Sequence, residues 1–166
     1  YIGVGVAAGG AAILGLVSSL AVIWLRRRHG RFLDSLYVER VLSVGPKVVA
    51  IGGGSGLPSL LKGLKHYTSN ITAIVTVADD GGSSGRLRSE LGILPPGDIR
   101  NCLVALADSE AIMQQLMDYR FSTNGQLDGH SFGNILIAAL ASIGGDFYKG
   151  VEAAGDLLAI RGRVIP

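Results

Sequence analysis

The stretch KVVAIGGGSGLPSLLKGLKHYTSNITAIVTVA, residues 47–78, decides the fold class. Residues 47–51 are a short β-branched run without polar alternation, which is typical of a strand covered on both faces in a parallel sheet. A glycine-rich loop at residues 52–56 leads into leucines at helical spacing, residues 57–64, and a second apolar run follows at residues 71–78. This order predicts a βαβ unit with a right-handed crossover, and hence an α/β fold with a mostly parallel sheet and flanking helices.

The rest of the chain reads mainly as polar loop and helix. Residues 79–97 are polar, and a helix is expected to open at Asp98, whose side chain suits the N-cap position. We recognise only two convincing strands, and two parallel strands cannot bury both faces of a sheet alone. The remaining strands are therefore expected in sequence beyond this chain. Further helical patterns cover residues 111–121, 131–142 and 150–160.

The first 25 residues of the chain carry no charged side chain. As a helix they would reach about 37 Å at ~1.5 Å per residue, enough to cross a hydrocarbon core of ~30 Å. Arginines follow at once, and the positive-inside rule places the rest of the chain in the cytoplasm. We predict one transmembrane helix at residues 1–25, a basic juxtamembrane connector at 26–46 and a cytoplasmic domain at 47–166. A buried globular helix and a cleaved signal peptide are the alternatives.

Composition narrows the choice of partners. The mean hydropathy is +0.42, and the apolar excess is concentrated in the first 25 residues. Residues 47–166 hold ten Lys and Arg against eleven Asp and Glu, so we expect no nucleic-acid partner. Cys102 is the only cysteine, which excludes an internal disulfide and a multi-cysteine zinc site. An assembly of identical chains stays an open alternative.

The glycine-rich loop, GGGSG at residues 52–56, stands where ligands of open α/β sheets bind. Its backbone N–H groups lie at the start of a helix, and glycines let phosphate oxygens approach them. It is not a Walker A loop, and Leu57 breaks the GxGxxG spacing of dinucleotide sites. A tight turn that requires positive φ is the structural alternative. The residues predicted to contact phosphate are Gly53, Gly54, Ser55 and Gly56.

A second candidate loop is ADDGGSSGRLR, residues 78–88, at the end of the second predicted strand. Asp79 and Asp80 could hold ribose hydroxyls or, through oxygen ligands, Mg²⁺. Backbone N–H groups, hydroxyls and guanidinium groups that suit a phosphate follow. A solvated turn with a surface ion pair is the alternative. The candidate ligand-binding residues here are Asp79, Asp80, Ser83, Ser84 and Arg86.

Two further loops hold single polar candidates. PPGDIRN, residues 95–101, is a rigid turn that would bring Asn101 near the strand ends. GHSFG, residues 129–133, fits the GxSxG nucleophile elbow, but a polar loop rather than a strand precedes it and no histidine follows it. We therefore reject a hydrolase and expect the serine to start a helix. His130 and Asn134 near that start could donate hydrogen bonds to a sugar or a diphosphate.

Five ordered motifs carry a family resemblance: VVAIGGGSGL, ITAIVTVADDGGSSGRLR, PPGDIRNCLVAL, YRF and GHSFGN. In this order the chain from about residue 46 to residue 166 resembles the gluconeogenesis factor family, which is related to the 2-phospho-L-lactate transferases. The resemblance implies a Rossmann-like fold and a regulator that binds UDP-N-acetylglucosamine, linked to cell shape, wall precursor supply and gluconeogenic growth. The sequence departs from the family at Ser55, where Thr is common, and in its membrane span.

Two functions follow from the residues and the resemblance together. The first is a membrane-tethered regulator that binds a nucleotide-diphosphate sugar, without turnover and without a required cofactor. The second is an Mg²⁺-dependent transferase acting on a guanosine diphosphate donor, with Asp79 and Asp80 as metal ligands. No base–nucleophile pair and no acceptor-binding face are evident in the sequence, which favours the regulator. Ligand-facing residues implied by the resemblance are the loop residues named above together with Asn101, His130 and Asn134.

Overall fold

A computed structural model of the chain describes residues 38–78, 81–108 and 111–166. Contacts divide the chain into two units, Tyr1–Val41 and Leu42–Pro166, and the sheet and its helices belong to the second. The predicted membrane span at residues 1–25 lies outside the described residues, as does most of the connector. Among the helices that are described, none has the length and apolarity needed to cross a bilayer.

Three parallel strands form the sheet, in the order β1-β2-β3. β1 is Val48–Gly52, β2 is Ile71–Val75 and β3 is Arg163–Ile165. In the register of β1 and β2, Val48 lies opposite Ile71, so the predicted βαβ unit and the parallel α/β fold are confirmed. The expectation of only two strands within this chain is wrong. β3 escaped notice because its three residues are too few for a hydrophobic pattern to emerge.

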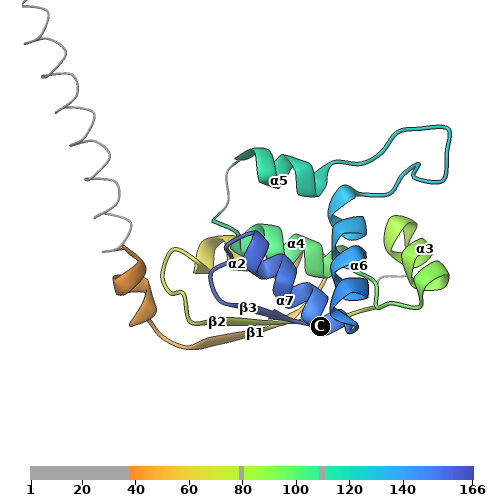
Figure 1. Ribbon diagram of the computed structural model, residues 1–166. Coiled ribbons are helices and arrows are strands. Elements are labelled where there is room, and N and C mark those ends of the chain that lie inside the picture. The colour runs from red at the N-terminus through yellow and green to blue at the C-terminus, as the bar shows by residue number, and fades with distance from the viewer. Residues whose placement is uncertain (1–37, 79–80, 109–110) are drawn as a thin grey trace, which may run out of the picture. The chain divides into compact units, whose positions relative to one another are not determined.

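Six helices accompany the sheet in the described part of this unit (Figure 1). α2, α4 and α7 pack against the sheet, and leucines from α2 and α4 meet the buried residues of β2 in one hydrophobic core. The helices stand on the same side of the sheet in Figure 1. Their bounds are α2 Gly56–Leu64, α3 Gly82–Leu91, α4 Gly97–Leu106, α5 Ala111–Asp118, α6 Phe132–Gly144 and α7 Phe147–Leu157.

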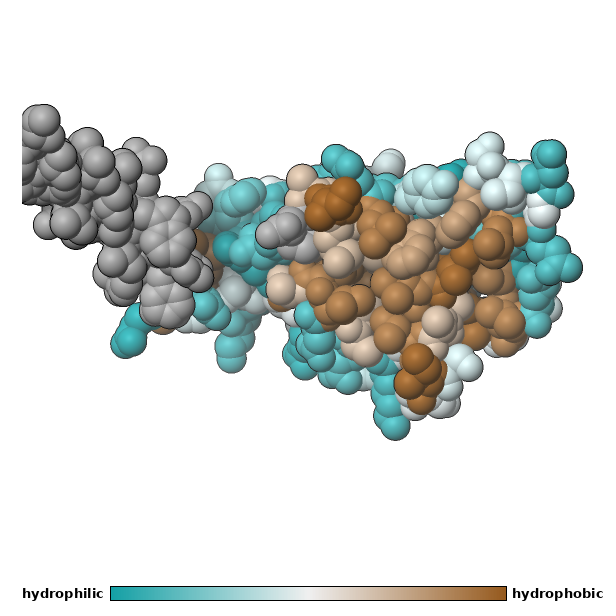
Figure 2. Space-filling model, turned by 45° about the horizontal axis from the view of Figure 1, so that its top comes forward, coloured by the Kyte–Doolittle hydropathy of each residue, from teal (hydrophilic) through white to brown (hydrophobic). Residues whose placement is uncertain are grey.

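The opposite face of the sheet is not covered by the residues that the structure describes. Val49 and Ile51 of β1 are 62% and 72% exposed, whereas Ala50 between them is buried. β1 therefore alternates between a covered and an open face, and the predicted cover on both faces is not provided by this part of the chain. Apolar side chains also gather on the helical side, where Figure 2 shows a broad hydrophobic surface with a hydrophilic rim.

α3 is the helix that the sequence did not reveal. It lies inside the stretch expected to be polar loop, residues 79–97. Its sequence GSSGRLRSEL is rich in glycine and serine, which are poor helix formers, so no apolar period stands out. One signal was available, because Gly92 ends the helix in the left-handed conformation (φ +66°) that glycine favours at this position.

Candidate functional site

The glycine-rich loop turns sharply between β1 and α2. Gly54 adopts a left-handed backbone (φ +58°), which a residue with a Cβ reaches only under strain. Gly53 has no room for a side chain, because a Cβ there would collide with the Thr76 hydroxyl and lie 3.0 Å from Asp98 Oδ2. The geometry of the loop itself therefore requires both glycines.

The Gly54 N–H group is already bonded inside the protein. It donates to Asp98 Oδ2 at 2.7 Å, across 44 residues of sequence. Asp98 is not the N-cap that the sequence predicted: Pro96 takes that position and Asp98 lies in the first turn of α4. Its carboxylate reaches the glycine loop instead of capping its own helix. A carboxylate thus occupies one of the amide donors that we expected a phosphate to use.

α3 begins beside an open cavity. Its N-cap, Gly81, has no side chain to cap the helix, and the amides of a first helical turn have no partner within the helix. The cavity has a volume of about 580 Å³. A helix start of this kind favours an anion through its N–H groups and its partial positive charge. The cavity is lined by Gly82, Ser83, Gly85, Arg86, Ser89, Asp128 and Gly129.

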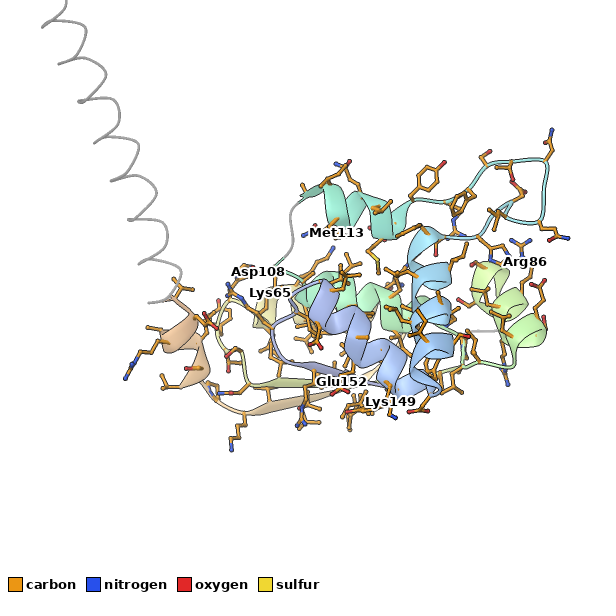
Figure 3. The ribbon with its side chains drawn as sticks, in the orientation of Figure 1. Lys65, Arg86, Asp108, Met113, Lys149 and Glu152 are labelled. Carbon is orange, nitrogen blue, oxygen red and sulfur yellow. The ribbon has the colours of Figure 1, made fainter. Side chains whose placement is uncertain are left out.

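Two arginines hold the turn that faces this helix start. Arg86 donates from its guanidinium group to the carbonyl of Asp128. Arg120 donates from Nη1 to the carbonyl of Gly129 at 2.6 Å. Figure 3 places Arg86 on α3 next to the connection between α5 and α6. Each guanidinium group has five N–H donors, so both retain donors after these bonds.

A buried polar network lies beneath the cavity. The Ser83 hydroxyl is 3.0 Å from His130 Nδ1, and Asn134 Nδ2 donates to the Ser83 and Ser84 hydroxyls at 3.2 and 3.4 Å. All four side chains are at least nine-tenths buried. The network joins the first turn of α3 to the first turn of α6, across 47 to 51 residues of sequence.

The start of α6 explains the GxSxG match. Ser131 is the N-cap of α6, and its hydroxyl accepts the backbone N–H of Asn134 at 3.3 Å. Ser131 is fully buried, so it starts a helix, as predicted, and is not presented as a nucleophile. Asn134 Oδ1 is buried without a hydrogen-bond partner among the described residues. The network therefore retains one unused acceptor.

His130 is neutral at physiological pH. Its pKa lies below the usual value of 6.5, chiefly because burial disfavours the charged ring. The positive charges of Arg86 and Arg120 lower the pKa further, against an opposing effect of Glu90. A neutral imidazole has one donor and one acceptor nitrogen, so His130 can bond to the Ser83 hydroxyl without adding charge.

The hydrogen bond found for the Asn101 side chain is to Arg100, not to a member of this network. Asn101 Oδ1 accepts a hydrogen bond from Arg100 Nη2 at 2.7 Å, on the same helix. Arg100 packs under α6, where a Cβ at Gly133 would lie 2.8 Å from Arg100 Cδ. The pKa of Arg100 is lowered by burial, which the neighbouring Asp118 opposes. Asn101 therefore orients an arginine that is only partly exposed, and its predicted contact with a ligand stays a prediction.

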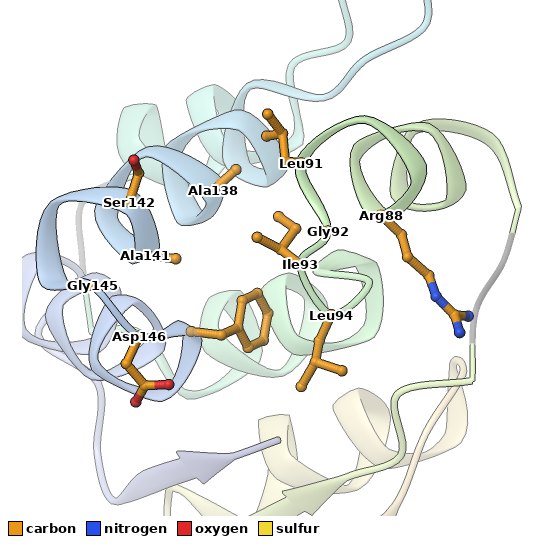
Figure 4. Close-up of a pocket in the computed structure, with 11 residues that line it drawn as sticks. Arg88, Leu91, Gly92, Ile93, Leu94, Ala138, Ala141, Ser142, Gly145 and Asp146 are labelled. Atoms are coloured by element: carbon orange, nitrogen blue, oxygen red, sulfur yellow. The ribbon is translucent and has the colours of Figure 1, made fainter.

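A second, larger cavity separates α3 from the α6–α7 turn (Figure 4). Its volume is about 740 Å³. Its walls are mostly apolar, formed by Leu91, Ile93 and Phe147 among others, with Arg88 at one side. The sequence did not predict this cavity, because its walls come from two segments that are far apart in the chain, residues 88–94 and 138–147.

The family described as 2-phospho-L-lactate transferase CofD matches residues 48–166. The chain belongs to the CofD family. The resemblance found in the sequence motifs is therefore confirmed, including the relation to the 2-phospho-L-lactate transferases. Every candidate site residue named above lies within the residues that match the CofD family.

Relatives of this CofD-family chain carry the name of gluconeogenesis factors. A Nostoc sp. PCC 7120 protein, named "Putative gluconeogenesis factor", is 59% identical over 90% of this chain. The "Gluconeogenesis factor" of Bacillus subtilis 168 is 55% identical over 73% of it. The chain spans only 33% and 38% of these two relatives. A crystal structure of a Bacillus halodurans protein superposes with a TM-score of 0.69 at 55% identity, covering 72% of this chain and 39% of that one.

The predicted site residues thus fall into groups. Ser83, Ser84, His130 and Asn134 form one network, with Arg86 beside it. The glycine loop bonds to Asp98, a residue that we had expected only to cap its own helix. Asp79 and Asp80, the predicted Mg²⁺ ligands, lie outside the described residues. Within the described part of the chain, no three His, Cys, Asp or Glu side chains gather as a metal site would require.

Proposed function

We propose that this CofD-family chain binds a nucleotide-diphosphate sugar of the UDP-N-acetylglucosamine type and acts as a regulator without turnover. The observation that carries the proposal is the cavity at the start of α3, where uncapped helix amides, Arg86 and the neutral His130 network come together. The diphosphate is the part of such a ligand that this site suits. The uridine and sugar components rest on the resemblance to gluconeogenesis factors.

The electrostatics of the cavity support a doubly charged anion. The partial positive charge of the α3 start and the charges of Arg86 and Arg120 face the same turn. Asp128 is the acidic residue in the lining, and the arginines bond to backbone carbonyls of the turn rather than to its carboxylate. Both arginines therefore keep their charge available to a phosphate.

The cellular part of the proposal comes from the sequence. We propose that residues 1–25 tether the protein to the cell membrane, with the CofD-family domain in the cytoplasm. There the protein would link nucleotide-sugar level to cell shape, wall precursor supply and gluconeogenic growth. Ligand binding alone is sufficient for this role, so no cofactor is required.

A second candidate function is an Mg²⁺-dependent transferase. The family match to 2-phospho-L-lactate transferase CofD favours it. Asp79 and Asp80 would hold the metal, whose charge would stabilise the phosphates of a guanosine diphosphate donor. Turnover of such a donor with a deazaflavin acceptor and Mg²⁺ would establish this function in place of the regulator.

Binding is tested with the full-length protein by thermal unfolding with UDP-N-acetylglucosamine. At a hundredfold excess over the dissociation constant, the ligand should add about 2.7 kcal/mol of stability. Arg86→Ala should weaken binding about tenfold, because one charge-assisted hydrogen bond to phosphate is lost. Arg163→Ala, in the exposed part of β3, is the matched control and should bind normally. Absence of any shift with uridine nucleotides would refute the proposal.

A further inference from the structure

The bond between Gly54 and Asp98 places a negative charge against the glycine-rich loop. Gly54 N–H to Asp98 Oδ2 is short, at 2.7 Å, as expected for a bond to an ionised acceptor. The bond lies where β1 ends, beside Thr76, whose N–H donates to the Gly52 carbonyl at 2.8 Å. It therefore lies at the edge of the sheet where ligands of α/β proteins bind.

The fold presents Asp98 to this loop from a well-held position. The preceding residues, Pro95, Pro96 and Gly97, are all buried. Asp98 lies in the first turn of α4, and its partner Gly54 lies just before α2, so two helix starts favour the carboxylate charge. Burial raises the pKa of the Cys102 thiol to about 12, and the charge of Asp98 contributes to this increase.

We propose that Asp98 is an internal anion that holds the glycine loop in place and excludes phosphate from it, so that the ligand's diphosphate binds at the first turn of α3. The second half of this statement rests on the proposed function. The glycine motif alone predicts that an anion binds at the loop. Asp98 is thus the residue that directs the anion to α3 instead.

Exclusion follows from geometry and charge. A phosphate oxygen can take the Gly54 N–H only by displacing Asp98 Oδ2, which already accepts from it. If the carboxylate stays, the two negative charges lie within contact distance and repel each other. The loop cannot relieve this by moving inward, since Gly53 is already packed against Thr76 and Asp98. At α3 the acidic residue of the cavity lining is Asp128, and its Oδ1 accepts the Thr123 N–H at 3.0 Å.

Two substitutions separate the bond from the charge. Asp98→Asn keeps a side-chain oxygen that can accept from Gly54 but removes the negative charge. Asp98→Ala removes both. Asp156→Ala, an exposed carboxylate near the end of α7, is the matched control for a change in total charge. Selective ¹⁵N-glycine labelling of the full-length protein reports on the loop through Gly54 and on α3 through Gly82.

Inorganic pyrophosphate is the probe. In the wild type and in Asp156→Ala it should shift the Gly82 signal and leave the Gly54 signal in place. In Asp98→Ala, amide exchange at Gly54 should be about tenfold faster or more without the probe, because a charge-assisted bond is lost. Pyrophosphate should then shift the Gly54 signal too. Asp98→Asn should keep slow exchange at Gly54 and gain the shift, which holds even if the alanine variant fails to fold.

The outcomes separate the inference from the proposed function. A Gly54 shift in the wild type at the concentration that shifts it in Asp98→Asn would overturn the inference. So would a Gly54 signal that does not respond to pyrophosphate in either variant. If Gly82 does not respond in any protein, the anion site at α3 and with it the proposed function fail. The comparison of Gly54 between wild type and variants would still decide whether Asp98 closes the loop.

Discussion

The two ends of the parallel sheet differ in how far their polar side chains are paired with one another. At the amino end, Lys65 Nζ donates to the Ala107 carbonyl at 2.6 Å, and Arg161 pairs with Asp108 at 2.7 Å. Arg161 also reaches the Lys65 carbonyl at 3.4 Å, so the three side chains tie α2 and α4 to the turn before β3. Figure 3 shows Lys65 and Asp108 next to each other.

At the carboxyl end, by contrast, polar groups remain unused. Among the described residues, the buried side-chain atoms without a partner are Arg100 Nε and Asn134 Oδ1, and both belong to residues at the start of α6 or packed against it. At the start of α3, the N-cap residue Gly81 has no side chain to cap the helix. A buried polar group without a protein partner is unfavourable unless a water, an ion or a ligand supplies the missing hydrogen bond. Under the proposed function, the amino end serves stability and the carboxyl end serves binding.

The largest effect is expected from Thr68 at the amino end. Its hydroxyl donates to the Pro46 carbonyl at 2.9 Å and accepts the Asn70 N–H at 3.0 Å, and the residue is fully buried. Thr68→Val keeps the shape but leaves both backbone groups unpaired, which should lower the free energy of unfolding by about 2–3 kcal/mol. Urea denaturation measures the loss.

The same variant should bind UDP-N-acetylglucosamine as the wild type does once it is folded, because Thr68 belongs to the end that serves stability. A tenfold rise in its dissociation constant would mean that the two ends are coupled, and that stability and binding are not divided between them.

A smaller loss of stability is expected from Ser83 at the carboxyl end. Ser83→Ala removes the hydroxyl that joins His130 to Asn134, at a cost of about 1–2 kcal/mol. Binding should weaken about tenfold, since the first turn of α3 loses its support. Calorimetric titration measures this, with Ser142→Ala on the exposed side of α6 as control. Unchanged affinity in Ser83→Ala would show that the network is structural only.

The difference between the two ends also explains what could be predicted from sequence. β1, α2 and β2 follow from apolar runs and a glycine-rich loop, which are local patterns. The contacts that build the carboxyl end are not local: Gly54 and Asp98 are 44 residues apart, and Ser83 and His130 are 47 residues apart. Residue type identified the members of the network, but only the packing of α3 against α6 reveals that they bond to one another.

Asp98 is the clearest case of this limit. Its position before an apolar helical pattern suits an N-cap, and a single sequence offers no reason to assign it otherwise. The structure places the N-cap two residues earlier, at Pro96, and the Asp98 carboxylate instead accepts a hydrogen bond from the glycine loop. Thr68 was not singled out at all, since a lone threonine between a helix and a strand carries no local signal.

The smallest expected effect is the pH dependence contributed by His130. Its folded-state pKa lies below 6.5, because of burial and then of Arg86 and Arg120. As the pH falls through 6.5, the unfolded chain takes up the proton before the folded protein does. The contribution of neutral His130 to stability is therefore fully present above pH 6.5 and is lost as the pH falls through the lower, folded-state pKa.

His130→Gln should reduce this loss, and the comparison is between urea midpoints at about pH 7.5 and about pH 5.5. His66→Gln, which changes an exposed histidine at the end of α2, is the matched control and should keep the wild-type difference. Bound pyrophosphate should reduce the difference between the two urea midpoints in the wild type. Its negative charge offsets the charges of Arg86 and Arg120, and this raises the folded-state pKa of His130. If pyrophosphate narrows the difference in the wild type but not in His130→Gln, the histidine and the anion share one site. If it narrows both equally, the anion acts elsewhere and the carboxyl end is not the binding end.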